Sequence, residues 1–208
     1  MFSIKDNLAN IVSISRIFVA FAAVALLFVP SDVTLMWAFW LTAVAFAMDG
    51  LDGYIARKFN QSSDLGSVLD IMGDRIVEVT YWVAFAVLGW LNIVFPLICV
   101  TRAFVTDSIR SVALSKGFTA FGEKTMQKSD LGKFICASKF MRISYAVAKV
   151  GAFMLLILAH IAGCRLCALI NLPVIAQILA CIAIIFCVIR ALPVVFESGD
   201  LFKKAENE

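Results

Sequence analysis

Residues 49–74 read DGLDGYIARKFNQSSDLGSVLDIMGD, and four of the five aspartates in this stretch lie at helical spacings. Asp49 and Asp52 are three residues apart, whereas Asp70 and Asp74 are four residues apart. Each pair therefore shares one face of a helix, and two neighbouring helices would direct all four carboxylates at one point. Ionisable groups at membrane depth are costly and usually face a cavity or a partner, so the cluster predicts a functional site.

The composition around this stretch is that of a membrane protein. Of 208 residues, 62% are hydrophobic and only 16% are charged, with a net charge of +3. The mean hydropathy is +0.95. A soluble domain of this length does not need so much apolar sequence to fill a core. We therefore expect an all-α integral membrane protein that forms a single domain over residues 1–208, and we expect no nucleic-acid partner.

Six segments are long enough to cross a bilayer, which takes about 20 residues. They are approximately residues 9–29, 34–57, 67–90, 92–115, 137–162 and 168–192. Phe2, Ile4 and Leu8, together with Lys5 and Asp6, predict a short amphipathic helix before the first span. No cleavable signal is recognisable, so the first span is expected to remain in the protein.

The distribution of basic residues predicts the orientation. Residues 30–33 and 89–92 contain no Lys or Arg, whereas Arg57, Lys58 and the stretch 110–142 are basic. Basic loops remain in the cytoplasm, so both termini are predicted to be cytoplasmic. This orientation places the aspartates at cytoplasmic helix ends, within reach of a soluble substrate. Inner or plasma membrane is the expected location.

The residue types in the cluster favour a metal and a polyphosphate. Carboxylate oxygens are the ligands of hard divalent ions, and two such ions suit displacement at phosphorus. Gly50, Gly53, Ala56 and Gly66 allow close approach of a ligand or of another helix. Arg57 supplies a cation for phosphate. Small residues can also mean helix packing alone, but unpaired carboxylates do not stabilise a membrane helix.

The spaced pattern of these residues resembles the signature of the CDP-alcohol phosphotransferase family. The matching positions are Asp49, Asp52, Gly53, Ala56, Arg57, Gly66, Asp70 and Asp74. The resemblance implies a membrane enzyme of six helices that transfers a phosphatidyl group from a CDP-linked lipid to an alcohol and releases CMP. It also implies two Mg²⁺ or Mn²⁺ ions and a homodimer in a lipid membrane.

The resemblance assigns roles to individual residues. Asp49, Asp52, Asp70 and Asp74 are the implied metal ligands, and Asp74 is the implied general base toward the acceptor hydroxyl. Gly53, Ala56, Arg57 and Gly66 are implied to bind the CDP donor. Asn10 and Ser13, followed by Arg16, are similar to a nucleotide-contacting start of phosphatidylglycerophosphate synthases, although Ala9 replaces a usual proline.

A second basic group resembles the acceptor side of the same branch. Arg102, Arg110 and Lys133, with Gly117 and Gly132, are similar to its fourth helix and the following polar loop. Ala103 and Ile135 depart from that pattern, and Lys139 and Arg142 are the expected substitutes. Each cation alone also fits a membrane-surface anchor. The group favours a phosphorylated acceptor, first glycerol 3-phosphate and then inositol 3-phosphate.

Two alternatives remain open from the sequence. A phosphatidylinositol-phosphate synthase or another CDP-alcohol phosphotransferase would use similar residues. A divalent-cation transporter would use the four carboxylates as a transit site, although no repeat is present and Arg57 would repel a cation.

Other polar residues are expected to be structural. Glu78 is predicted to pair with Arg75. His160, Cys164 and Cys167 lack a fourth metal ligand, so packing is the expected role of His160. The sequence does not decide whether the two cysteines form a disulfide.

Overall fold

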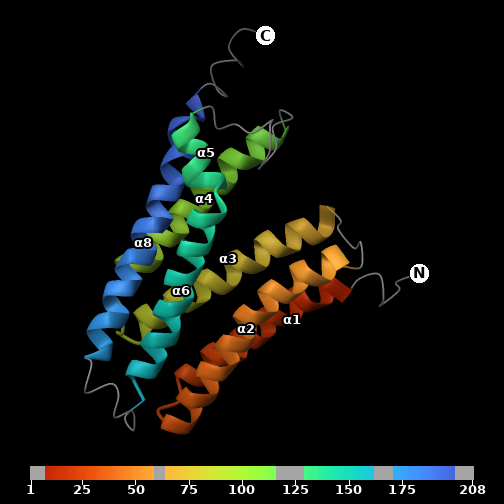
Figure 1. The fold of residues 1–208 in the computed structure, drawn as a ribbon. Helices are drawn as coiled ribbons and strands as arrows, with labels where there is room; N and C mark the ends of the chain where they lie inside the picture. Colours follow the sequence, from red (N-terminus) through yellow and green to blue (C-terminus); the bar gives the residue numbers. More distant parts are fainter. Residues whose placement is uncertain (1–7, 59–63, 116–128, 162–170, 200–208) are drawn as a thin grey trace. The chain divides into compact units, whose positions relative to one another are not determined.

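The computed structural model describes residues 8–58, 64–115, 129–161 and 171–199 (Figure 1). These residues form seven helices: α1 (Leu8–Leu27), α2 (Asp32–Lys58), α3 (Asp64–Val87), α4 (Val94–Ser115), α5 (Asp130–Ala137), α6 (Lys139–Ala159) and α8 (Leu172–Phe196). The prediction of an all-helical chain is confirmed. The amphipathic helix predicted around Phe2 and Ile4 lies outside the described residues.

Four of the described helices are long and apolar enough to cross a membrane, namely α1, α2, α6 and α8. Large apolar side chains point outward from them, including Phe18 at 67% exposure and Trp37 at 61%. An outer surface of this kind suits lipid rather than water. The chain is therefore an integral membrane protein built of α-helices. Among the helices predicted to span, α3 and α4 fall outside this group, and both carry several charged residues.

The chain separates into two compact units. The first comprises residues 1–93 and 153–177, and the second comprises residues 94–152 and 178–208. In the first unit, α1 packs against both α2 and α3 (Figure 1).

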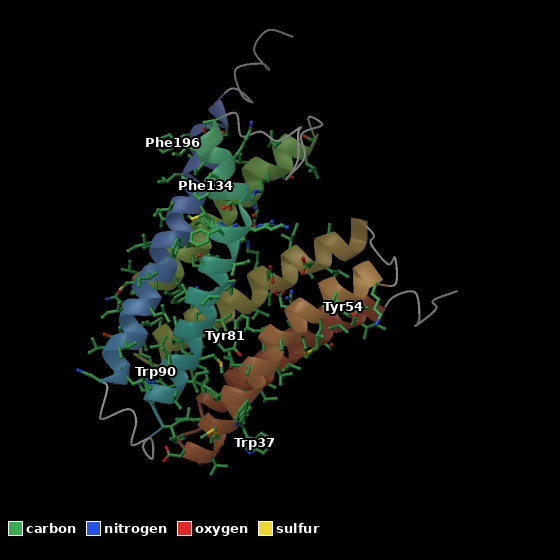
Figure 2. The ribbon with its side chains drawn as sticks, in the orientation of Figure 1. Trp37, Tyr54, Tyr81, Trp90, Phe134 and Phe196 are labelled. Carbon is green, nitrogen blue, oxygen red and sulfur yellow. The ribbon has the colours of Figure 1, made fainter. Side chains whose placement is uncertain are left out.

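The interior of the first unit is an aromatic cluster around Phe153. The Phe153 ring stacks on Tyr81 with centroids 5.2 Å apart and meets Trp82 edge-on at 4.8 Å. Tyr81, Trp82 and Phe153 are all fully buried (Figure 2 labels Tyr81). Thr42 Oγ1 donates to the Ala38 carbonyl at 2.6 Å and lies 2.8 Å from Tyr81 Oη. The hydrogen bond between Thr42 and Tyr81 joins α2 to α3.

The turn after α3 requires a glycine. Gly89 has φ of +74°, in the left-handed region that glycine enters without steric cost. The amides of Gly89 and Trp90 then bond the carbonyls of Ala86 and Phe85, at 3.1 and 2.9 Å. These hydrogen bonds give partners to the last backbone carbonyls of α3 and end the helix.

The second unit corrects one sequence expectation, because Gly132 and Lys133 lie in a helix and not in a polar loop. The Ser129 side chain caps α5 by accepting the Gly132 amide at 2.9 Å. Ser138 then adopts extended backbone (ψ 140°) and separates α5 from α6. The predicted segment 137–162 is therefore one helix, α6, preceded by a separate short helix.

Candidate active site

Three carboxylates converge in the first unit. Asp49 lies in α2, whereas Asp70 and Asp74 are one turn apart in α3. One carboxylate oxygen from each lies within 4.8 Å of the others. The three side chains are about half exposed, at 43%, 53% and 49%. The predicted convergence of the α2 and α3 carboxylates is thus present for these three residues, and the group remains open to solvent and to ligands.

An arginine from α1 lies among these carboxylates. The Arg16 side chain is only 3% exposed, and its guanidinium forms an ion pair with Asp49. Nη1 also lies 3.2 Å from Asp74 Oδ1, and Nη2 lies 3.7 Å from Asp70 Oδ1. Nη2 donates a further hydrogen bond to the Asp70 carbonyl at 3.3 Å. One buried cation therefore contacts all three acids.

The donor set fits a hard divalent ion. Its oxygens are clustered and accessible, and they already attract a cation in the form of the Arg16 guanidinium. Mg²⁺ and Mn²⁺ prefer such oxygen ligands. Asp49, Asp70 and Asp74 are the described residues that would hold the metal. The side chain of Asp52, the fourth predicted ligand, lies outside the described residues.

The predicted donor-binding residues are only partly described. Asn10 and Gly53 are half-buried, as is Gly66, while Ser13 is buried at 5% exposure. All four make contacts within the protein. The side chains of Ala56 and Arg57 lie outside the described residues. Roles of these six residues in donor binding therefore stay predictions.

A second charged group, of opposite sign, lies in the second unit. Arg102 and Arg110 in α4 lie within electrostatic range of Arg190 in α8. Arg102 is 8% exposed. Nε and Nη1 of Arg102, and Nε of Arg190, are buried with no hydrogen-bond partner among the described residues. Buried guanidinium N–H groups without partners are costly, so this group is suited to an anionic ligand.

Two uncharged side chains border this arginine group. The Arg190 guanidinium lies 5.4 Å from the centre of the Tyr145 ring, a cation–π distance. Cys136 Sγ donates to the Arg190 carbonyl at 3.4 Å. Burial raises the pKa of the Cys136 thiol, and the neighbouring Arg110 and Arg190 partly oppose that rise. Cys136 is therefore a protonated thiol near neutral pH.

The remaining predicted acceptor residues are exposed. Lys133 is in α5, and Lys139 and Arg142 are in the first turn of α6, all with exposed side chains. Arg102 and Arg110 lie close enough to Arg190 for their charges to interact. The role of Lys133, Lys139 and Arg142 in the acceptor site stays a prediction.

Sequence reasoning noted Arg16 only for its similarity to a nucleotide-contacting segment and gave no role to Arg190, whereas the structure brings both residues forward. Each is an arginine within a helix that is long and apolar enough to span a membrane. A charge in such a segment needs a partner or a ligand, and that signal would have drawn attention to both.

Two structural expectations hold. Arg75 pairs with the buried Glu78 at 3.5 Å. His160 stacks on Trp90 with ring centroids 3.9 Å apart, and its Nδ1 lies 2.8 Å from the Leu156 carbonyl. Packing thus accounts for His160, whereas Cys164 and Cys167 lie outside the described residues.

Comparison with known proteins gives a consistent result. A family model described as CDP-alcohol phosphatidyltransferase matches residues 6–196. A CDP-diacylglycerol–glycerol-3-phosphate 3-phosphatidyltransferase from Pseudomonas fluorescens is 29% identical over 118 residues, covering 56% of this chain and 60% of that protein. Its counterpart from Mycoplasma genitalium is 23% identical over 129 residues, covering 54% and 55%.

A relative with another acceptor in its name is equally similar. A phosphatidylinositol phosphate synthase from Corynebacterium glutamicum is 30% identical over 106 residues, covering 48% of each chain. The chain therefore aligns with about half to three-fifths of the length of these relatives.

Proposed function

Because this chain belongs to the CDP-alcohol phosphatidyltransferase family, we propose that it transfers a phosphatidyl group from CDP-diacylglycerol to glycerol 3-phosphate and releases CMP. The observation that carries the acceptor assignment is the arginine group of the second unit, whose buried N–H groups lack protein partners among the described residues. A phosphorylated alcohol supplies the anion that such a group needs. An uncharged alcohol such as inositol, or zwitterionic serine, supplies no phosphate.

The proposed reaction is a displacement at phosphorus. The acceptor hydroxyl oxygen forms a new bond to the phosphatidyl phosphorus, the bond to the bridging diphosphate oxygen breaks, and CMP leaves with that oxygen. Divalent ions, when bound, would stabilise charge on the attacking and leaving oxygens. Asp49, Asp52, Asp70 and Asp74 would hold them.

The chain's own residues perform the remaining tasks. Asp74 accepts the proton of the acceptor hydroxyl, a role that requires hydrogen-bond reach of that hydroxyl. Arg102 and Arg190 bind and orient the acceptor phosphate through their buried N–H groups. Asn10, Ser13, Gly53, Ala56, Arg57 and Gly66 bind the donor.

The proposal includes the membrane topology. All six long helices cross the bilayer, with the charged faces of α3 and α4 turned to protein or to substrate. Both termini and the carboxylates lie on the cytoplasmic side, where a soluble acceptor and CMP exchange. A homodimer is the proposed assembly.

A second acceptor is supported by one observation, the similarity to a phosphatidylinositol phosphate synthase. An inositol phosphate carries the same anionic group and would use the same arginines. The competing transport hypothesis, in which the carboxylates pass a divalent cation across the membrane, has no comparable support from the family match.

The test is CMP release by the purified protein with CDP-diacylglycerol and Mg²⁺. Glycerol 3-phosphate, inositol 3-phosphate, inositol and serine are compared as acceptors, with Asp70→Asn as the control for the carboxylate centre. Release with glycerol 3-phosphate alone supports the proposal. Release with another acceptor reassigns the acceptor, and Mg²⁺ flux in proteoliposomes without nucleotide turnover would support transport instead.

A further inference from the structure

The Arg16 guanidinium contacts the same acids that a metal ion would need as ligands. Its Nη1 contacts Asp49 and Asp74, and its Nη2 contacts Asp70. These are three of the four carboxylates assigned to the metal. A guanidinium and a divalent ion therefore compete for the same oxygens, because each oxygen has few lone pairs to offer.

The place of the guanidinium is shaped by the neighbouring helix. Gly73, one residue before Asp74, is buried, and a Cβ added there would lie 2.8 Å from Arg16 Nη2. Nη2 also donates to the Asp70 carbonyl, on the same helix. α3 thus leaves a space against its backbone that the end of the Arg16 side chain fills, and any larger residue at 73 would push the guanidinium out.

The hydrogen bonding of Arg16 is incomplete in this position. Its Nε is buried and has no hydrogen-bond partner among the described residues. Arg16 is therefore held chiefly by the charges of the acids, which are the same charges that attract a metal. Three acids with oxygens within 4.8 Å would repel one another without a cation, and one guanidinium neutralises one of them.

From this geometry we propose that Arg16 is a built-in counter-cation of the carboxylate centre: it stabilises the acids in the metal-free protein, yields them to divalent ions, and so sets the metal affinity. The inference rests on the proposed metal centre. Its consequence is that the protein folds with the acids already gathered, at the cost of weaker metal binding.

The experiment measures Mn²⁺ binding to the full-length protein in detergent, after metal removal, by electron paramagnetic resonance of free Mn²⁺. Arg16→Gln removes the competing charge and is expected to bind Mn²⁺ about tenfold tighter or more, the size of effect that one adjacent unit charge has on a carboxylate equilibrium. Gly73→Ala keeps the charge but displaces Nη2, and is expected to act in the same direction by a smaller factor.

Gly73→Ala also covers the case in which Arg16→Gln fails to fold without metal, because the added Cβ meets only the flexible end of a side chain. Lys149→Gln, which removes a cation over the Tyr145 ring in the second unit, is the matched control and should leave Mn²⁺ affinity unchanged. Asp70→Asn should weaken binding, which locates the ion at the carboxylates.

The outcomes separate the two claims. Tighter binding in Arg16→Gln or Gly73→Ala, with Lys149→Gln unchanged, supports the inference. Unchanged or weaker binding in both variants, while the wild type binds Mn²⁺, overturns the inference and leaves the metal centre intact. A wild type that binds no Mn²⁺ overturns both.

Discussion

The carboxylates of the first unit and the arginines of the second unit balance their clustered charges in opposite ways. Asp49, Asp70 and Asp74 surround a cation supplied by the chain itself, Arg16. Arg102 and Arg190 instead lie within electrostatic range of each other, and several of their buried N–H groups have no partner among the described residues.

This difference indicates what each group requires. Like charges in a poorly solvated place repel, and removing a counter-charge there is strongly destabilising. The three acids already contact the Arg16 guanidinium, which neutralises one of their charges, so a metal ion must displace that contact. The buried N–H groups of Arg102 and Arg190 instead lack acceptors among the described residues. An anionic ligand would therefore add hydrogen bonds without displacing any.

The largest expected effect comes from the acid side. Asp70→Asn should lower turnover about a hundredfold to a thousandfold, as expected when one group that stabilises transition-state charge is lost. The measurement is CMP release at saturating donor and acceptor, with membrane content and thermal unfolding as the check on folding. Near-normal turnover by a folded variant would refute the metal role of Asp70.

The next effect tests the arginine side. Arg102→Gln should raise the KM for glycerol 3-phosphate about tenfold to a hundredfold, because a hydrogen bond to a charged group contributes about 1.5–3 kcal/mol. The kcat should change less. Inorganic phosphate should raise the thermal unfolding temperature of the wild type more than that of Arg102→Gln. Equal KM values for the two proteins would contradict the assignment, and Lys149→Gln is the control.

A smaller effect concerns Cys136. This cysteine is in α5, close to Arg102 and Arg110 of α4 and to Arg190 of α8. Burial raises the pKa of its thiol above the ordinary cysteine value although three arginines lower it. The thiol should therefore alkylate slowly at pH 7.5, and its rate should rise about tenfold for each pH unit up to the raised pKa, since the thiolate is the reactive form. Peptide mass spectrometry follows the modification, with Cys136→Ser as the blank.

The same pKa has a consequence for stability. The Cys136 thiol has a higher pKa in the folded state than in the unfolded state. The contribution of the protonated thiol to the free energy of unfolding is therefore fully present below the pKa of the unfolded state. It is lost as the pH rises through the pKa of the folded state. Fast alkylation of the folded protein at neutral pH would show that the arginines outweigh burial.

The smallest effect concerns the cap of α5. Ser129 accepts the Gly132 amide and also bonds the Glu197 carboxylate at the end of α8. Ser129→Ala should lower the free energy of unfolding by about 1 kcal/mol, a typical value for a lost N-cap. Thermal unfolding in detergent measures it. Ser129→Thr, which keeps the hydroxyl, should retain most of the stability, and a loss as large as that of alanine would argue against the cap.

Local patterns predicted most of the helices, whereas long-range pairing was beyond them. Hydropathy placed α1, α2 and α8 to within a few residues, because apolar length alone determines a membrane helix. The short helix α5 was missed, because Gly132 and Lys133 fit the end of the polar loop that precedes the predicted span 137–162.

The candidate site divides in the same way. Helical spacing predicted that Asp70 and Asp74 share a face, a property of one helix. The partners of Arg16 lie in α2 and α3, more than thirty residues away, and no periodicity encodes such a distance. Arg190 likewise reaches its arginine neighbours from another helix. Only the presence of a charge in an apolar segment signals that such a partner must exist.

The hydrogen bond between Thr42 and Tyr81 also fixes an alignment. Thr42 has one hydroxyl proton, which it donates to Ala38, so Tyr81 must be the donor across the helix pair. Asp49 lies seven residues beyond Thr42, and Asp74 lies seven residues before Tyr81. Both carboxylates are thus about 10 Å along their helices from the same reference contact, at about 1.5 Å per residue. Sliding α3 along α2 by a single residue would break the Thr42–Tyr81 hydrogen bond and shift Asp74 by about 1.5 Å relative to Asp49. A misplacement of about this size between reacting groups can lower the rate of reaction about a hundredfold.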